Sequence, residues 1–302
     1  MELCLAVDVG GTKMAVGLVS RDGLVVRQAQ IPTPRTGSSE TLFAALAQAI
    51  TGVLGEGPSH AGEQRADPVV VCGVGCGGPM SLAEGRVSPL NIPAWQGFPL
   101  QERLRDLTGL SVSVDNDAKA LALGEGWMGA ARGRSDFLAM VVSTGVGGGI
   151  VLDGRLLDGA SGNAGHVGHV IVEPEGRRCG CGAHGCLEAE ASGSAIAMIT
   201  GRPPSEAPPE IVERAGRMVG RAVGSVSNLL DLEVTVVAGS VALGFGSPFF
   251  AAANAELHKR ARLSFSKSGR IVPAGLGARA PLVGAGAVGW RSAGYEVLTC
   301  PR

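Results

Sequence analysis

Short apolar runs separated by glycine-containing turns fill the first part of the chain. Runs of this length predict buried strands, whereas apolar residues spaced three and four apart predict helices. Strands are expected at Leu3–Val9, Met14–Ser20, Leu24–Gln30, Pro68–Val74 and Ser111–Val114. Helices are expected at Ser38–Leu54, Gly97–Leu107 and Lys119–Met128, the first with a serine or threonine cap.

The cycle of strand, Gly/Thr turn and strand returns in the second part of the chain. Strands are expected at Phe137–Ser143, Ile150–Leu152, Val234–Ala238 and Ile271–Pro273, with a glycine turn at Gly145–Gly149 and helices at Pro208–Leu230 and Pro281–Gly294. Strands alternating with helices indicate an α/β fold. The repeated cycle predicts two related α/β domains with a cleft between them. We expect a smaller domain at 1–115, a larger one at 116–285, and a C-terminal helix at about 286–302 that packs back on the first.

Composition and charge narrow the function. The 302 residues suffice for two domains, and the formal net charge of -1 lacks the basic surface that nucleic-acid binding requires. The apolar start at Leu3–Val9 is too short for a secretion signal and contains Asp8, and no run reaches the about 20 apolar residues of a membrane span. A cytoplasmic protein without membrane or nucleic-acid partners is expected.

Two glycine-containing turns offer groups for binding a polyphosphate. The first contains Asp8, Gly10, Gly11, Thr12 and Lys13, and the second contains Thr144, Gly145 and Gly147–Gly149. Backbone N–H groups of glycine turns can approach an anion closely, and a carboxylate at a strand end can hold Mg²⁺ through water. Each turn alone could equally be a tight hairpin, but the two together predict a phosphate clamp.

A third glycine-rich segment, Gly73–Gly78, matches the G-x-G-x-x-G pattern of dinucleotide-binding proteins. That function needs a helix to open directly after the glycines, and Pro79 followed by a non-periodic stretch argues against one. We therefore interpret the segment as a loop whose backbone amides can contact a polar ligand.

The run Asp115-Asn116-Asp117 stands between an expected strand and an expected helix. A carboxylate in this place can act as a general base, and an adjacent asparagine can hydrogen-bond a hydroxyl. The alternative is a helix cap, because Asp and Asn are both favoured there.

Three cysteines crowd into one short glycine-rich loop, and a histidine precedes them. His169 with Cys179, Cys181 and Cys186 makes a donor set that suits a closed tetrahedral zinc site. His184 inside the loop is a rival ligand, and free buried thiols are the alternative to a metal site. Seven cysteines in total, an odd number, argue against a disulfide framework.

Taken together these motifs resemble the ROK family of repressors, open reading frames and sugar kinases. Asp8-Val9-Gly10-Gly11-Thr12-Lys13 looks like the first phosphate motif of that family, and Cys179–Glu188 matches its C-x-C-G-x-x-G-C-x-E pattern at every fixed position. The resemblance covers essentially the whole chain. It implies a two-domain actin-like, ribonuclease-H-like ATPase fold that closes over a sugar and ATP, and a homodimer formed through the larger domain.

The resemblance also implies roles for individual residues. Asp117 is the expected catalytic base. Sugar contacts are expected from Gly78, Asn91, Asn116, Asp117, His166, His169 and Glu188. ATP with Mg²⁺ is expected at the two phosphate turns and at Gly239 and Ser240, near Gly244, and structural zinc at His169 and the three cysteines.

One position departs from the glucokinases of the family, which usually carry Glu-x-Gly-His before the zinc motif. This chain has His166-Val167-Gly168-His169. An imidazole in place of a carboxylate puts glucose in doubt, and other hexoses such as mannose or fructose, or amino hexoses such as kanosamine, become candidates for phosphorylation at the 6-hydroxyl. The alternatives are a sugar-sensing repressor, for which the expected first strand leaves no room for a preceding helix-turn-helix, and a sugar-binding protein without kinase activity.

Overall fold

The computed structural model describes residues 1–55 and 67–298, which form two compact units. Unit 1 contains Met1–Met128, Asp158–Asn163 and Ala278–Val297, whereas unit 2 contains Gly129–Leu157 and Ala164–Gly277. The first division therefore falls after Met128 and not at the expected residue 115.

Packing between two helices explains where unit 1 ends. Helix α3 (Asp117–Met128) lies against α9 (Ala280–Ser292), and a Cβ at Gly284 of α9 would lie 2.6 Å from the backbone oxygen of Ala120. Such close backbone approach needs a residue without a side chain. The helix expected at about 286–302 thus begins earlier and ends at Ser292, and residues 299–302 lie outside the described ranges.

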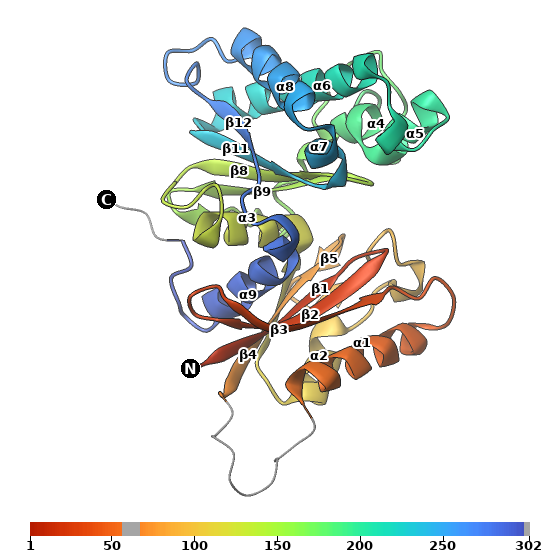
Figure 1. Cartoon of the computed structure of the whole chain (residues 1–302), viewed down its shortest axis with the longest axis vertical. Coiled ribbons are helices and arrows are strands. Elements are labelled where there is room, and N and C mark those ends of the chain that lie inside the picture. The colour runs from red at the N-terminus through yellow and green to blue at the C-terminus, as the bar shows by residue number, and fades with distance from the viewer. Residues whose placement is uncertain (56–66, 299–302) are drawn as a thin grey trace, which may run out of the picture. The chain divides into compact units, whose positions relative to one another are not determined.

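Unit 1 is built on a five-stranded sheet in the order β3-β2-β1-β4-β7 (Figure 1). Its strands are β1 (Leu3–Val9), β2 (Lys13–Ser20), β3 (Val25–Pro32), β4 (Val69–Cys76) and β7 (Val112–Asn116). β1, β2 and β3 are antiparallel neighbours, whereas β1, β4 and β7 run parallel. Helices α1 (Ser39–Leu54) and α2 (Leu100–Thr108) cover one face and α9 the other.

Short elements complete unit 1. The strands β5 (Met80–Ser81) and β6 (Arg86–Val87) form a small separate sheet, and the 3₁₀ helix η1 (Pro93–Trp95) follows them. A strand therefore follows the Gly73–Gly78 segment where a dinucleotide-binding loop would open a helix.

Unit 2 repeats the same strand plan in the order β10-β9-β8-β11-β12. The strands are β8 (Phe137–Val142), β9 (Val146–Leu152), β10 (Arg155–Leu156), β11 (Val234–Ala238) and β12 (Arg270–Pro273). Again an antiparallel hairpin stands beside parallel strands. The repeated cycle in the sequence thus corresponds to two sheets with one topology.

The helices of unit 2 pack through small residues. They are α4 (Leu187–Ala191), α5 (Gly193–Thr200), α6 (Pro209–Leu230), α7 (Ser240–Phe245) and α8 (Ser247–Arg260), with the 3₁₀ helices η2 (Val167–His169) and η3 (Pro204–Glu206) at loops. The 3₁₀ helix η4 (Gly277–Arg279) begins at the last residue of this stretch of unit 2 and continues into unit 1. Gly216 and Gly220 of α6 face the backbone of α8, where a Cβ would lie 2.4 and 2.3 Å from carbonyl oxygens. The sequence analysis did not predict α4, α5, α7 or α8 as elements.

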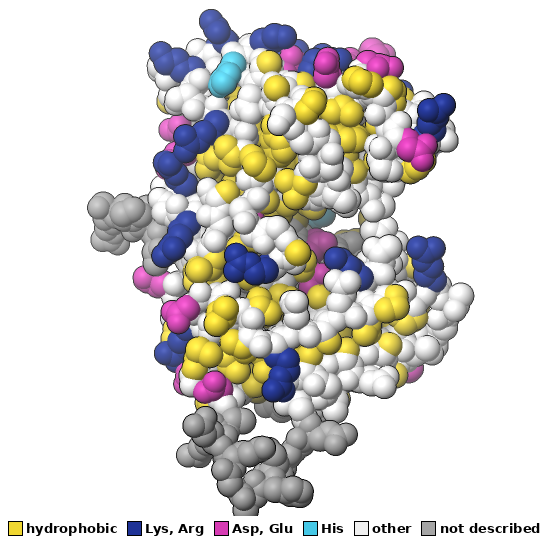
Figure 2. Space-filling view, viewed as in Figure 1, with side chains coloured by type: hydrophobic (Ala, Val, Ile, Leu, Met, Phe, Trp, Pro, Cys, Tyr) yellow, Lys and Arg dark blue, Asp and Glu magenta, His cyan; other side chains and the backbone are white. Residues whose placement is uncertain are grey.

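The visible surface of both units mixes charged and apolar side chains. On the face shown in Figure 2, Lys and Arg side chains lie dispersed among acidic and apolar ones. Within the described ranges, none of the helices combines the length and the apolar character that crossing a bilayer requires.

Candidate functional site

In unit 1, the carboxyl ends of three parallel strands bring acidic residues into one row. Asp8 of β1 pairs with Gly75 of β4, which pairs in turn with Asp115 of β7. A Cβ built at Gly75 would lie 3.6 Å from Oδ1 of Asp8 and 3.7 Å from Cα of Asp117, the first residue of α3. The absence of a side chain at Gly75 therefore leaves Asp8 and Asp117 close to each other.

This crowding changes the acidity of Asp8. The pKa of its carboxyl is raised from 3.8 to about 7, first by burial and then by the nearby charge of Asp117, whereas the charge of Lys13 lowers it. A carboxylate held beside another without full hydration is destabilised in its charged form. A divalent cation in this place would relieve that repulsion, so the donors present suit Mg²⁺.

Because of the raised pKa of Asp8, the free energy of unfolding of the ligand-free protein should depend on pH. Because the folded-state pKa of Asp8 lies above the unfolded value, protonation favours folding, and stability should fall as the pH rises from about 4 to 7. Asp8→Asn removes the effect, so the variant should be more stable than the wild type at pH 8, on the order of 2 kcal/mol with solvent screening allowed for, and similar to it at pH 4. Denaturant unfolding without nucleotide or Mg²⁺ measures the difference. Asp22→Asn, in an exposed turn, is the control, and a wild-type curve parallel to that of Asp8→Asn would contradict the prediction.

The start of α3 combines a helix cap with the candidate base. Oδ1 of Asn116 and Oδ1 of Asp117 both accept from the backbone N–H of Ala118, at 3.0 and 2.8 Å. A Cβ at Gly78 would lie 3.2 Å from Nδ2 of Asn116, so this glycine lies against the same asparagine. Asp117 is exposed, and a carboxylate can accept more than one hydrogen bond. Capping and catalysis are therefore compatible here.

The first turn that we expected to bind phosphate is a tight loop between β1 and β2. The backbone N–H of Gly10 donates to the carbonyl of Lys13 at 3.0 Å, and the Thr33 hydroxyl donates to the carbonyl of Gly10 at 2.6 Å. A Cβ at Gly11 would lie 2.5 Å from Cβ of Asn91, which places this asparagine against the turn. The side chain of Thr12 is exposed beside it. The structure thus gathers the expected phosphate and sugar residues of unit 1.

Unit 2 contains a cavity of about 770 Å³ beside the second turn. Its lining is mostly apolar with several hydroxyl groups: Thr144, Gly193, Ser194, Ala197, Pro204, Ser205, Ala207, Pro209, Val212, Ser240, Val241, Gly244, Phe245 and Pro248. The hydroxyls of Ser143 and Ser240 lie 3.0 Å apart at this edge. Gly239, which precedes α7, has φ of 101°, and a Cβ there would lie 2.2 Å from the Val142 oxygen. Only glycine fits where β11 turns into the helix.

Most lining residues of this cavity were not expected from the sequence. Thr144 and Ser240 were predicted, and Gly244 was placed near them, whereas the proline-rich stretch Pro203–Pro209 and Phe245 were not singled out. A run with four prolines in seven residues, just before a long helix, is the sequence signal that could have marked a rigid wall.

The glycine turn expected at 145–149 is wrong, because β9 begins at Val146 and takes in Gly147–Gly149. Two of the glycines in this region serve close packing: a Cβ at Gly148 would lie 2.7 Å from Cγ2 of Val167, and one at Gly168 would lie 2.3 Å from the Val146 oxygen. They let the histidine-bearing segment lie directly on the strand. The turn between β8 and β9 is therefore only Ser143–Gly145.

Glu188 joins that shortened turn. Its Oε2 accepts from the backbone N–H of Val146 at 3.0 Å, and a Cβ at Gly145 would lie 2.9 Å from the same oxygen. His166 and His169 lie at the two ends of η2, and the centroids of their rings are 6.1 Å apart. Unit 2 thus brings the turn, one carboxylate and two imidazoles together.

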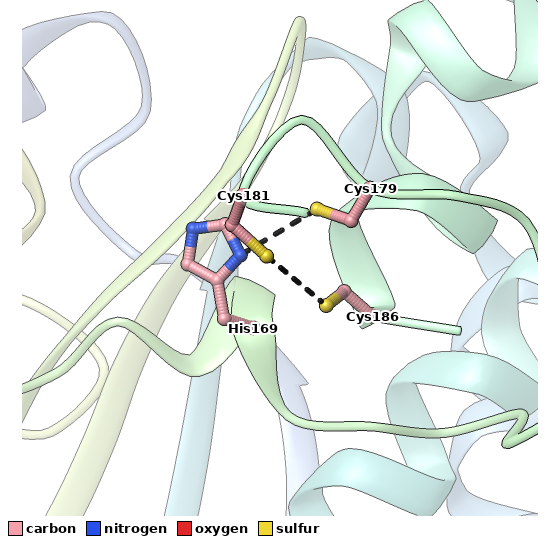
Figure 3. A group of neighbouring side chains, drawn as sticks. All are labelled: His169, Cys179, Cys181 and Cys186. Carbon is pink, nitrogen blue, oxygen red and sulfur yellow. Dashed lines mark hydrogen bonds between the residues drawn. The ribbon is translucent and has the colours of Figure 1, made fainter. Parts of the chain in front are cut away.

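The four side chains expected to bind zinc lie together. Ligand atoms of His169, Cys179, Cys181 and Cys186 all lie within 4.8 Å of one another (Figure 3). The Sγ atoms of Cys181 and Cys186 are 3.7 Å apart, and Sγ of Cys179 is 3.7 Å from Nδ1 of His169. Tetrahedral zinc with Zn–S bonds of about 2.3 Å requires sulfur separations of about 3.8 Å, so the donors fit zinc.

The rival ligand His184 lies outside this cluster. Its Nδ1 is 3.2 Å from the carbonyl oxygen of Gly176, and the side chain is exposed. The loop also turns at Gly182 and Gly185, with φ of 96° and 69°. These left-handed positions let the loop fold the three thiols inward.

Known proteins resemble this chain in sequence and in fold. The chain is similar to a glucokinase of Thermotoga maritima, with 41% identity over 194 residues, which is 64% of this chain and 58% of that protein. It is 36% identical to an N-acetylmannosamine kinase of Citrobacter koseri, over 80% of this chain and 84% of that protein. The crystal structure of a ROK hexokinase from Thermus thermophilus superposes with a TM-score of 0.78 at 32% identity, over 97% of this chain and 99% of that one.

These similarities extend over the whole architecture. The fold is the two-domain actin-like ATPase fold of the ROK sugar kinases. The profile of the family matches residues 4–290 and so takes in the acidic row of unit 1, the cavity of unit 2 and the zinc-type cluster. The chain belongs to the ROK family.

Proposed function

We propose that this protein transfers the γ-phosphoryl group of ATP to the 6-hydroxyl of a hexose or amino hexose. Its glucokinase and N-acetylmannosamine kinase relatives support sugar kinase activity. The observation that carries the proposal is the position of Asp117, at a strand–helix junction beside Asp8. This pair supplies a proton acceptor and a site for the cation that accompanies ATP.

In the proposed reaction, Asp117 accepts the proton of the sugar hydroxyl as the oxygen bonds to the γ-phosphorus and the bond to ADP breaks. Asn116, Gly78 and Asn91 orient the sugar. Asp8 would hold Mg²⁺ through water, and the bound ion supplies neutralisation of phosphate charge. Because phosphoryl transfer has a loose transition state, orientation of the hydroxyl and of the phosphates contributes most of the rate.

The cavity of unit 2 is the proposed adenosine site. Its size and its mainly apolar walls are typical of small-molecule pockets. Thr144 and Gly145 of unit 2 adjoin it and would contact phosphate. In unit 1, the proposed phosphate contacts are Gly10, Gly11, Thr12 and Lys13. Gly239 and Ser240 would border the nucleoside.

We assign His169, Cys179, Cys181 and Cys186 to a structural zinc ion. The cluster is complete with four protein ligands, which is typical of structural zinc and leaves no open position for substrate. Glu188 is two residues beyond the last cysteine, so the metal would shape the loop that presents this carboxylate to the sugar. Homodimer assembly and a cytoplasmic location stay predictions.

The imidazole of His166 suggests that the preferred sugar is not plain glucose. A carboxylate only accepts hydrogen bonds, whereas neutral imidazole donates one and accepts one. N-acetylmannosamine kinases are among the relatives that cover most of this chain, so an N-acylated amino hexose joins the candidates.

A coupled ADP-release assay tests both the activity and the sugar. We expect ADP release with at least one of glucose, mannose, fructose, glucosamine, kanosamine and N-acetylmannosamine. His166→Glu should raise kcat/KM for glucose relative to the preferred sugar by about tenfold, because one polar mismatch against a bound sugar is worth roughly 1–3 kcal/mol. His184→Glu, in the exposed part of the zinc loop, is the control. An unchanged ranking of sugars would remove His166 from specificity, and sugar binding without ADP release from any of them would indicate a sugar-binding protein instead of a kinase.

A further inference from the structure

A buried lysine lies in the first turn of the helix that Asp117 begins. The side chain of Lys119 is only 1% exposed, and its Nζ is 3.0 Å from Oδ1 of Asp115 and 2.6 Å from Oδ1 of Asp158. The same Nζ donates to the carbonyl oxygen of Gly162 at 3.2 Å. Burying an ammonium group is costly unless its hydrogen bonds are satisfied, and here all three are.

Two of the three partners of Lys119, Asp158 and Gly162, lie on a segment with an unusual place in the chain. Residues Asp158–Asn163 belong to unit 1, although the residues directly before and after them belong to unit 2. The segment is also fixed at Gly162, where φ is 81° and a Cβ would lie 2.5 Å from Cδ1 of Leu82. Three residues after it comes His166.

The two charged partners of Lys119 differ in burial. Asp115 is almost wholly buried and adjacent on β7, whereas the Asp158 side chain is 47% exposed. A half-exposed partner adds little stability, because solvent screens the pair. The contact with Asp158 therefore contributes more to where the segment lies than to whether the unit folds.

We propose that Lys119 is a positioning residue for sugar binding, which it serves by fastening Asp158–Asn163 to the helix of the catalytic base. The inference rests on the proposed kinase function. The chain passes from this segment into unit 2, where His166 and His169 follow. The contact with Lys119 ties the start of that passage to α3, the helix that begins with Asp117. Loosening the contact should weaken sugar binding and leave nucleotide binding alone.

Asp158→Asn is the main test, because it removes the charge on the segment and leaves the pair of Lys119 and Asp115 intact. It also removes an ion pair between Asp158 and Arg291 of α9 at 3.5 Å, so Arg291→Gln, which removes that pair alone, should leave KM for the sugar unchanged. We expect KM for the preferred sugar to rise about tenfold, the scale of one charge-assisted hydrogen bond, with KM for ATP changed by less than about twofold and the pH profile unchanged. Asp158→Glu keeps the charge, so its KM for the sugar should stay close to that of the wild type. Arg155→Gln, which breaks an exposed pair with Asp153 just before the segment, is the matched control and should match the wild type.

Hydrogen exchange separates this inference from the kinase function. Amides of residues 159–166 should exchange about tenfold faster in Asp158→Asn and in Lys119→Met than in the wild type, with or without activity. If the wild type phosphorylates no sugar, the proposed function fails, whereas faster exchange would still support the fastening. If KM for sugar and KM for ATP shift together, or if only the melting temperature changes, Lys119 has a merely structural role and the inference is wrong.

Discussion

Replacing Asp117 by asparagine should lower kcat at least about 100-fold, because a general base contributes roughly 10²–10⁴-fold. Asparagine is nearly the same size and can still accept from the backbone N–H of Ala118, so the start of α3 should stay intact. Sugar binding should change little, since amide and carboxylate oxygens both accept hydrogen bonds. The measurement is steady-state ADP release with saturating ATP and sugar, together with sugar affinity by calorimetry.

Asp106→Asn is the matched control for this substitution. Asp106 is an exposed aspartate on α2 of the same unit, and its replacement should leave kcat unchanged. If Asp117→Asn turned over at nearly the wild-type rate, another group would have to accept the proton. A parallel loss of sugar affinity would point to a binding role for Asp117 and not a catalytic one.

Loss of the metal should have the second large effect. Elemental analysis should find one zinc per chain, and Cys181→Ser should abolish most of it, because the four donors act together. Zinc binding is coupled to folding of its loop, so the melting temperature should fall by roughly 5–10 °C, which corresponds to a few kcal/mol in a protein of this size. Sugar KM should rise with it, since Glu188 follows the zinc loop.

His184→Asn distinguishes the metal site from the loop in general. This residue lies in the same loop but outside the donor cluster, so its replacement should keep the zinc content and the melting temperature of the wild type. Metal-free protein with full stability and activity would contradict a structural zinc. Equal zinc loss in His184→Asn and Cys181→Ser would show that the four donors are not the ligands.

Strands whose signal is local could be predicted closely. Leu3–Val9 and Val234–Ala238 are buried apolar runs bounded by glycine or polar residues, and both strands have the expected bounds. The short helices α4, α5 and α7 could not, because five to eight residues show no clear period. Helix α8 was missed because its amphipathic character is weak, with small residues dominating its first half.

Glycines show where local reasoning fails. Glycine residues in a turn and glycines that admit a neighbouring backbone look alike in a sequence, and Gly148 is of the second kind. The zinc-type cluster was predictable because its donors lie close together in the chain. The fastening of Lys119 was not, because Asp158 is 39 residues away and only the folded chain brings it near.

The discontinuous make-up of unit 1 has a consequence for how the protein emerges from the ribosome. Its sheet is complete once β7 has been synthesised, but α9, which covers one face of that sheet, is made only after the whole of unit 2. Because the ribosome adds about 5–20 residues per second, the apolar face of β1 and β4 stays without α9 for on the order of ten seconds. Nascent chains that pause before Ala280 should therefore be bound by chaperones that recognise exposed apolar strands, and release should coincide with the synthesis of α9.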